Sequence, residues 1–536
     1  MKQAQSKAEP AQAAPQTPAK KAIKAETGEK KPPAKRRTPK AAEVETTPKP
    51  AAAKKPRAPK KPALPVLKVL FASSEAQPFS ASGGLADVAG SLPGALKGEG
   101  VDCRVVVPLY GDMKPALREK LHFLVSFEVD LSWRKQYCGI FEAVEGGVTY
   151  YFIDNEYYFK RSGIYGYFDD AERFAYFSKA VLEMLRHLDF EPDILHANDW
   201  QTALVPVYLN LFYRGVKSLE HVKTVFTIHN IQYQGQFGMD ILGDVLGIDQ
   251  RDARILEFDG GVNLLKAAAE MSDRVTTVSP TYAQEILDPW FAHGLDTFLQ
   301  ARSFKLSGIL NGLDTALYNP SDDPLIYQAY DASALELKTA NKEALLHELS
   351  MQPIEGTPLI GIVSRLVDHK GLDLIKYVFE DMLRLGAQFV VLGSGEHVYE
   401  EFFRTMQDKY PQNVRFIAGF LPALAHKIYA GADMFLMPSK SEPCGLAQMI
   451  AARYGTAPIV RETGGLKDTI RDFGGENGNG FTFKTYNAHD MLSAVQRAKA
   501  CYDNKEQWAA LQQVAMSSDF TWGKSAKEYI DLYKSI

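Results

Sequence analysis

Short apolar runs, each ending at a polar or glycine-containing loop, recur along most of the chain and constrain its fold more than any other feature. The runs are three to eight residues long, and several are separated by segments with helical periodicity, such as residues 171–188 and 263–271. Runs of this kind are typical of strands buried on both faces of a parallel sheet, with helices as the connections. The sequence therefore predicts an α/β protein.

The apolar runs form two series. The first comprises residues 68–72, 101–107, 150–153, 194–196, 222–229 and 274–278, and the second comprises 359–363, 389–392, 414–418, 434–437 and 457–460. A stretch rich in Asn, Asp and Pro, residues 312–324, separates them. We predict two similar α/β domains, 66–315 and 356–515, joined by a linker, 316–355. A tail helix, 516–536, is expected to pack back on the body, and a ligand cleft is expected between the strand ends of the two domains.

Residues 1–65 differ in composition from the rest. They contain 17 Lys or Arg, 5 Glu and no Phe, Tyr or Trp, so the remaining residues are acidic although the net charge is only −4. Such a segment buries too little apolar surface to offset its chain entropy, which predicts a disordered basic arm. The arm is either a solvated spacer or a segment that contacts polyanions. It lacks the continuous apolar segment that a secretory signal peptide contains.

The four cysteines are Cys103, Cys138, Cys444 and Cys501, and their wide spacing matches neither a metal site nor a disulfide framework. This favours a reducing compartment, and hence the cytoplasm. No apolar stretch approaches the ~20 residues of a membrane span. The sequence sets no oligomeric state.

Two loops of the second series carry charged residues. Arg365 and Lys370 follow the run 359–363, and two cations five residues apart at a strand-to-helix turn suit a diphosphate. Glu442 follows the run 435–437, where it either caps the next helix or holds sugar hydroxyls. Cys444 has no sequence neighbour that would activate a thiolate. We therefore expect it to pack in the loop or to line the site with its backbone, and not to act as a nucleophile. Together the loops resemble the donor half of a nucleotide-sugar glycosyltransferase.

The strand ends of the first series carry histidines and glycines. Gly83 and Gly84 follow the first strand and open a helix, whose N-terminus favours negative charge. His196 and His229 each end a strand and are followed by Asn or Asp. A lone histidine is more often structural, and a glycine turn after a strand is common. Two such histidines at two strand ends nevertheless indicate a functional edge.

Eleven segments carry a resemblance to the bacterial glycogen synthases and plant starch synthases over residues 68–533. They are FASSEAQPF, GGLADV, RSGIYG, HANDW, FTIHNIQYQG, RVTTVSPTYAQEI, GILNGLD, SRLVDHKG, EPCGLAQ, YGTAPIVRETGG and FTWGKSAKEY. The resemblance implies two Rossmann-like domains facing a central cleft, the GT-B fold. It implies retaining transfer of glucose from ADP-glucose to the 4-hydroxyl at the non-reducing end of an α-1,4-glucan such as glycogen. No cofactor and no metal are implied.

The resemblance also implies roles for individual residues. Arg365 and Lys370 would bind the diphosphate and stabilise the leaving nucleotide. Glu442 would hold the glucosyl ring, and His229 and Asp199 match active-site positions. The expected substrate contacts are Gly83, Gly84, Asp87, Asn230, Asn311, Phe420, Cys444, Gly445 and Leu446.

The chain departs from the family pattern at several positions. Ala81 stands where the family has a lysine. Either another cation, such as Arg461 or Lys467, occupies the space of that lysine, or the donor is bound there by backbone amides near Gly83 and Gly84. Phe420 stands where a tyrosine is common near the base, which preserves stacking and removes a hydroxyl. Two alternatives remain open: a retaining enzyme of this architecture with another nucleotide donor, and a weakly active glucan-binding scaffold.

Overall fold

The computed structural model of the chain describes residues 66–536. The predicted basic arm and its polyanion contact, residues 1–65, lie outside the described residues. None of the helices in the described part is long and apolar enough to cross a lipid bilayer.

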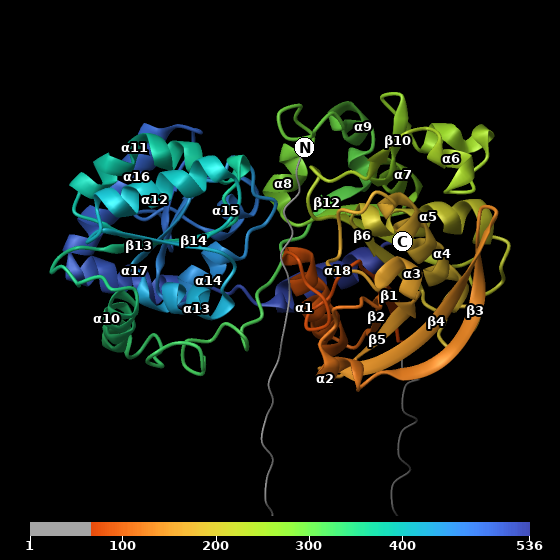
Figure 1. The fold of residues 1–536 in the computed structure, drawn as a ribbon, viewed down its shortest axis with the longest axis horizontal. Helices are drawn as coiled ribbons and strands as arrows, with labels where there is room; N and C mark the ends of the chain where they lie inside the picture. Colours follow the sequence, from red (N-terminus) through yellow and green to blue (C-terminus); the bar gives the residue numbers. More distant parts are fainter. Residues whose placement is uncertain (1–65) are drawn as a thin grey trace, which may run out of the picture. The chain divides into compact units, whose positions relative to one another are not determined.

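Within residues 66–308, nine strands form one sheet in the order β12-β11-β7-β6-β1-β2-β5-β4-β3 (Figure 1). The strands are β1 Lys68–Ala72, β2 Asp102–Pro108, β3 His122–Leu131, β4 Arg134–Glu145, β5 Val148–Asp154, β6 Ile194–Asn198, β7 Lys223–Ile228, β11 Arg274–Thr277 and β12 Leu306–Gly308. The pairs are parallel except for β3–β4 and β4–β5. Because parallel strands point the same way, the loops after β1, β6, β7 and β11 meet at one edge.

Helices cover both faces of this sheet because alternate strand residues point to opposite sides. Leu70 and Ala72 of β1 belong to the core beneath α4 (Asp170–Met184), α5 (Leu204–Tyr208) and α7 (Leu264–Met271). Val69 and Phe71 belong to the core beneath α1 (Gly84–Gly98) and α18 (Trp522–Lys534). The smaller elements here are α2 Pro115–Arg118, α3 Glu156–Phe159, α6 Ile241–Asp244, α8 Pro280–Glu285, α9 Asp296–Gln300, β8 Gln236–Phe237, β9 Glu257–Phe258 and β10 Gly261–Asn263.

Within residues 338–517, six strands form a second, all-parallel sheet in the order β15-β14-β13-β16-β17-β18. The strands are β13 Leu359–Val363, β14 Gln388–Gly393, β15 Val414–Ala418, β16 Met434–Met437, β17 Ala457–Arg461 and β18 Phe481–Phe483. Its helices are α10 Lys338–Glu348, α11 Leu372–Arg384, α12 His397–Lys409, α13 Pro422–Gly431, α14 Ala447–Arg453, α15 Gly464–Thr469, α16 Ala488–Asp503 and α17 Lys505–Ser517. One face packs against α11, α12 and α16 and the other against α13 and α14.

The chain crosses between the two sheets twice, and the crossings lie side by side. The Leu313 N–H donates to the Phe520 carbonyl at 2.7 Å, and a Cβ at Gly312 would lie 2.6 Å from backbone atoms of Trp522. Glycine at position 312 therefore allows the close approach. Beyond the crossing, α18 packs against α1, with Tyr529 and Tyr533 buried.

The predicted fold class is confirmed, and the strands β1, β13, β15 and β16 have the predicted bounds. The sequence analysis missed the β3–β4 hairpin, although apolar residues alternate with polar ones along β3. The domain boundaries predicted at 66–315, 316–355, 356–515 and 516–536 stay predictions, because the described residues 66–536 form one unit by their contacts.

Candidate active site

The loop after β13 carries Arg365 and Lys370 at the C-terminal edge of the second sheet. Arg365 is exposed and Lys370 is half-buried. The loop ends at Gly371, which has φ +74° and would place a Cβ only 2.1 Å from the Pro438 carbonyl oxygen. This close approach holds the β13 loop against the loop that follows β16.

Glu442 lies in the loop after β16 and pairs directly with Lys370. The Lys370 Nζ is 2.7 Å from the Glu442 Oε2, and the Ser439 hydroxyl donates to the same oxygen at 3.0 Å. Both Ser439 and Glu442 are buried. Leu446, not Glu442, occupies the N-cap of α14, so the alternative that Glu442 caps this helix is wrong.

Two glycines, Gly464 and Gly465, support the Glu442 loop from behind. A Cβ at Gly464 would lie 1.9 Å from the Glu442 carbonyl oxygen, and one at Gly465 would lie 2.2 Å from the Cys444 carbonyl oxygen. Only glycine fits at such distances. The glycine pair that ends the segment YGTAPIVRETGG therefore supports the backbone of the segment EPCGLAQ, which contains Glu442. Burial raises the pKa of the Cys444 thiol to about 12, which keeps it protonated and unreactive at neutral pH.

At the edge of the first sheet, Asp199 and His229 are joined through the backbone. Asp199 has φ +56°, and its Oδ1 accepts the N–H of His229 at 2.7 Å. Burial raises the pKa of Asp199 to about 7, the backbone N–H groups of His229 and Asn230 oppose the rise, and the Glu75 carboxylate adds to it. This carboxyl group is therefore poised between its two protonation states near neutral pH.

His229 is a neutral imidazole with a defined tautomer. Burial lowers its pKa to about 3. Its Nε2 lies 2.9 Å from the Asn198 Oδ1, and the Asn198 Nδ2 donates to the carbonyls of Ala72 and His196. The Asn198 oxygen must then accept, so the His229 Nε2 carries the proton and its Nδ1 is the acceptor.

His196 has a structural role, unlike His229. It is fully buried, with its Nδ1 2.7 Å from the Tyr533 hydroxyl and its Nε2 2.6 Å from the Thr227 hydroxyl. Both ring nitrogens are thus committed to tying α18 to β7. Only one of the two strand-end histidines faces the cleft.

A pocket of about 700 Å³, which we call the inner pocket, collects most of the predicted site residues. Its lining includes Gly83, Gly84, Asp199, His229, Asn230, Asn311, Arg365, Lys370, Cys444, Gly445 and Leu446. A Cβ at Gly83 or Gly84 would meet no protein atom within 4 Å, so protein packing does not require glycine there. The buried Asn311 Oδ1 has no hydrogen-bond partner within the described residues and is available to a ligand.

Three predicted residues lie outside this lining. Glu442 lies behind Lys370, to which it is paired. Asp87 sits in the first turn of α1, where burial raises its pKa to about 6 and the carboxylates of Glu75 and Asp314 add to the rise. Phe420 is 87% exposed and lines neither this pocket nor its neighbour, so its contact with a base stays a prediction.

The inner pocket also contains residues that the sequence analysis did not select, including Glu75, Tyr165, Trp200 and Tyr233. Glu75 is buried, and it accepts a hydrogen bond from the Ser82 N–H. Each of the four lies within a segment that carries the family resemblance, which was the available signal. The side chains themselves follow no spacing rule that would single them out.

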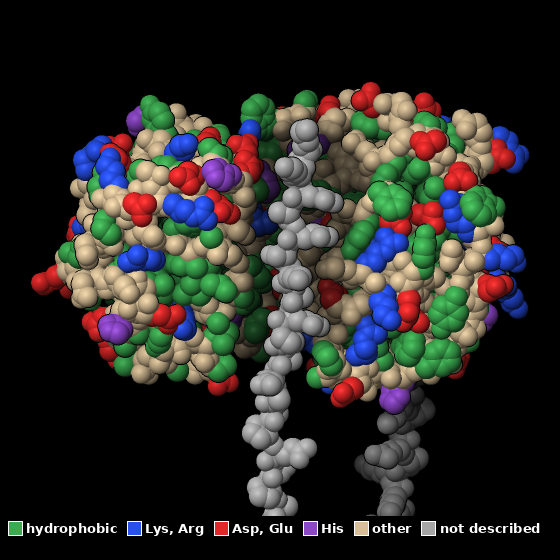
Figure 2. All heavy atoms as spheres, viewed as in Figure 1, with side chains coloured by type: hydrophobic (Ala, Val, Ile, Leu, Met, Phe, Trp, Pro, Cys, Tyr) green, Lys and Arg blue, Asp and Glu red, His purple; other side chains and the backbone are tan. Residues whose placement is uncertain are grey.

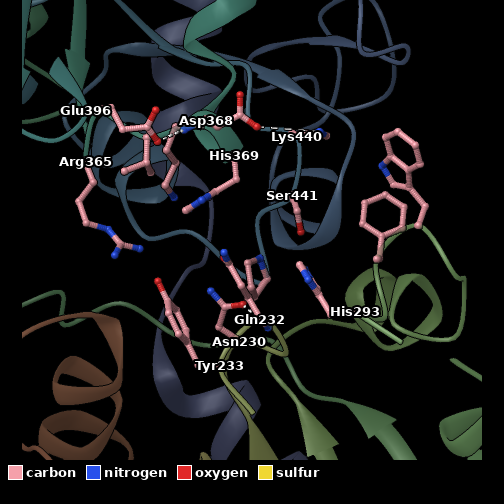
Figure 3. Close-up of a pocket in the computed structure, with 15 residues that line it drawn as sticks. Asn230, Gln232, Tyr233, His293, Arg365, Asp368, His369, Glu396, Lys440 and Ser441 are labelled. Atoms are coloured by element: carbon pink, nitrogen blue, oxygen red, sulfur yellow. Dashed lines mark hydrogen bonds and ion pairs between the residues drawn. The ribbon is translucent and has the colours of Figure 1, made fainter. Parts of the chain in front are cut away.

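A second pocket of about 530 Å³, which we call the outer pocket, adjoins the first (Figure 3). The two share Asn230, Tyr233, Arg365, Lys370 and Pro443. Residues 66–536 contain no group of three or more His, Cys, Asp or Glu side chains arranged to hold a metal ion. The candidate site consists of two connected pockets, and the side chains of Arg365 and Lys370 lie at their junction.

Comparisons with known proteins agree with this geometry. Residues 68–301 match the starch synthase catalytic domain, and residues 350–512 match glycosyl transferases group 1. The chain is 50% identical over 474 residues to a glycogen synthase of Anoxybacillus flavithermus, which covers 88% of this chain and 98% of that one. It is also 50% identical over 477 residues to a glycogen synthase of Clostridium acetobutylicum, covering 88% of this chain and 100% of that one.

Solved structures give the same result. The catalytic domain of starch synthase IV from Arabidopsis thaliana, bound to ADP and acarbose, superimposes with a TM-score of 0.81 at 37% identity, covering 88% of this chain and 99% of that one. Sucrose-phosphate synthase from Thermosynechococcus elongatus shares the fold at 16% identity and a TM-score of 0.54, covering 88% of this chain and 98% of that one. From the site geometry and these relationships together, the chain belongs to the glycogen and starch synthase family of glycosyltransferases.

Proposed function

We propose that this enzyme transfers glucose from ADP-glucose to the 4-hydroxyl at the non-reducing end of an α-1,4-glucan, with retention of configuration. The observation that carries the proposal is the Lys370–Glu442 pair beside Arg365, at the junction of two pockets. One carboxylate and two cations at one point suit a ligand that is a sugar on one side and a diphosphate on the other.

The two cations act on the leaving group. As the bond from the glucosyl carbon to the diphosphate oxygen breaks, negative charge grows on that oxygen. The acceptor 4-hydroxyl oxygen forms the new bond to the same carbon, and its proton passes to the departing diphosphate. Arg365 and Lys370 stabilise this charge by charge-assisted hydrogen bonds that are positioned before the reaction. They supply the positive charge themselves, and ADP-glucose enters as a co-substrate.

Glu442 and His229 act on the sugar. Lys370 and Ser439 both contact the Glu442 Oε2, and within residues 66–536 its Oε1 makes no hydrogen bond, so Oε1 can accept one from a sugar hydroxyl. The His229 Nδ1 presents an acceptor to another hydroxyl from the opposite sheet. Asp199 keeps His229 in place through the backbone contact at 2.7 Å. We assign Arg365, Lys370, Glu442 and His229 as catalytic residues and Asp199 as a positioning residue.

The relatives support the choice of substrates. The Arabidopsis structure contains ADP, a nucleoside diphosphate, and acarbose, an oligosaccharide analogue, in a protein that superimposes over 88% of this chain. A pocket of about 700 Å³ joined to one of about 530 Å³ has room for a nucleotide sugar and part of a glucan.

A donor competition assay tests the proposal. Purified enzyme is mixed with glycogen and radiolabelled ADP-glucose or UDP-glucose, and label in the polymer is counted. We expect incorporation from ADP-glucose to exceed that from UDP-glucose, and digestion of the product with an α-1,4-specific hydrolase to release the label. Preference for UDP-glucose would favour the alternative donor. Binding of glycogen without transfer from either donor would favour the scaffold alternative.

A further inference from the structure

The outer pocket has two chemically different sides. The sheet order places β14 and β15 on one side of β13 and β16 on the other. Arg365, after β13, and Glu396, before α12, lie on one side of the pocket in Figure 3, whereas Lys440, Ser441 and His293 lie on the other. The predicted contact of Phe420 with the nucleobase would lie on the β15 side, so we expect a different part of the substrates on the β16 side.

Trp290 lies on the β16 side and is presented to the pocket rather than packed in a core. It is 68% exposed, it lines the outer pocket, and its ring centre is 5.4 Å from the Lys440 Nζ. The segment that carries it is held by one local and one tertiary hydrogen bond. The Trp290 N–H donates to the Asp288 Oδ1 at 2.8 Å, and the His293 carbonyl accepts from the Gln234 Nε2 at 3.1 Å.

Three uncharged polar groups line the outer pocket together with this ring and Lys440, and they are suited to the hydroxyls of a polyol. Gln232, His293 and Ser441 offer donors and acceptors without a fixed charge near an exposed indole. A pyranose ring has one apolar face of C–H groups that stacks on an indole and a rim of hydroxyls that needs such partners. A glucan presents this combination repeatedly along its length.

The β16 side also connects to the place where the reaction is proposed. Asn230 and Tyr233 line both pockets, so a chain whose end reacts in the inner pocket can continue past them into the outer one. We propose that Trp290 is the platform of an outer acceptor subsite, which binds a glucosyl unit of the α-1,4-glucan away from its reacting end. This inference rests on the proposed function, because it takes the glucan as the acceptor.

Kinetics with acceptors of two lengths test the subsite. Trp290→Ala is compared with wild type at saturating ADP-glucose, using maltotriose and maltoheptaose. We expect the KM for maltoheptaose to rise about fivefold, equivalent to ~1 kcal/mol. The KM for maltotriose and the KM for ADP-glucose are expected to stay within about twofold, because neither the short acceptor nor the donor is expected to contact Trp290. Trp290→Phe should recover most of the affinity for maltoheptaose.

Trp133→Ala is the matched control. Trp133 is 72% exposed, lies between β3 and β4, and lines neither pocket. The β3–β4 hairpin also exposes Phe123, Tyr137 and Val144. Figure 2 shows hydrophobic side chains on the part of the surface where this hairpin lies in Figure 1. We expect this variant to match wild type with both acceptors, and equal melting temperatures of the two alanine variants would exclude a folding effect.

Tryptophan fluorescence separates binding from turnover. Maltoheptaose without donor should change the emission of wild type and Trp133→Ala clearly more than that of Trp290→Ala, in which Trp200 of the inner pocket still responds to the reacting end of the chain. An emission change in wild type that ADP alone produces and Trp290→Ala abolishes would overturn the inference, because it would place the nucleoside on this ring. Equal losses with maltotriose and maltoheptaose, or no loss with either, would also overturn it. Absence of transfer in wild type would instead refute the proposed function.

Discussion

The two sheets present different chemistry to the pockets that they share. The loops of the six-stranded sheet carry paired charges, Lys370 with Glu442, close to Arg365. The loops of the nine-stranded sheet carry groups whose ionisation is suppressed: the pKa of His229 is lowered to about 3 and that of Asp199 is raised to about 7 by burial. One edge is therefore suited to a charged diphosphate and the other to a neutral sugar chain.

The difference comes from how each loop is anchored. In the second sheet, glycines at positions 371, 464 and 465 let neighbouring loops approach so closely that charged side chains are held in fixed positions. In the first sheet, Asp199 and Asn198 use their side chains to hold His229 by its backbone N–H and its ring Nε2. The predictions below test this division of roles.

The largest expected effect follows from removing Glu442. Glu442→Ala leaves Lys370 and Ser439 without their shared acceptor and removes the contact proposed for the glucosyl ring. We expect kcat to fall roughly a hundredfold or more, as when a positioned charged partner is lost. Steady-state kinetics measure this, and Glu401→Ala on α12, outside both pockets, is the control. Near-normal turnover would show that Glu442 has only a structural role.

Removing either cation should impair donor use more than acceptor use. A charge-assisted contact is worth about 1.5–3 kcal/mol, so kcat/KM for ADP-glucose should fall roughly ten- to a hundredfold in Arg365→Ala and in Lys370→Ala. The KM for glycogen should change little. The measurement varies the donor at fixed glucan, with Lys376→Ala on α11 as the control. A change confined to the glucan dependence would contradict the diphosphate assignment.

The stability of an Asp87 variant at two pH values tests whether ionisation is suppressed at the edge of the nine-stranded sheet. Its pKa is raised to about 6, mainly by burial and further by Glu75 and Asp314. A carboxyl group with a raised pKa stabilises the fold when protonated and loses that contribution as the pH rises from its unfolded pKa through its folded pKa. Asp87→Asn should therefore raise the unfolding free energy by about 1–3 kcal/mol at pH 8 and by about half as much at pH 5. Denaturant unfolding at both pH values checks this, and equal gains at both would contradict it.

The smallest effect concerns Ala81, which is exposed in the loop before α1. Arg461 and Lys467, the cations considered as replacements for the missing family lysine, line neither pocket, and the Arg461 Nη1 donates to the carbonyl of Lys440 at 2.8 Å. A lysine in place of Ala81 should reach the donor's charged region and lower the KM for ADP-glucose about fivefold, equivalent to ~1 kcal/mol. Ala81→Gln, which is long but uncharged, is the control. A higher KM would show that the space already holds positive charge.

Much of the fold was accessible from the sequence because buried parallel strands are recognisable by composition. β13 and β16 have the predicted bounds, since a short apolar run flanked by loops has few other structures available. The β3–β4 hairpin was missed because one face of β3 is largely exposed, so its alternation of apolar and polar residues is weaker than a continuous run.

The candidate site was predictable to a smaller extent. Residues that carry chemistry in a strand-end loop, such as Arg365, Lys370 and Glu442, could be selected because the C-terminal edges of parallel strands form ligand sites. The structure was needed to separate His229 from His196, which have the same local pattern. Burial and the partners Tyr533 and Thr227 give His196 its structural role, and all of these contacts are distant in sequence.

The sequence by itself determined the α/β class, the charged residues at the ends of β13 and β16, and the resemblance to the glycogen and starch synthases. These depend on local composition and on short motifs, which can be identified in the sequence without knowledge of the fold. Only the tertiary structure decided that Lys370 reaches Glu442, 72 residues away, and that Lys440 lies over the ring of Trp290 at the outer pocket. Such pairings arise because packing brings separate loops to one edge, and no local pattern in the chain encodes a distance between them.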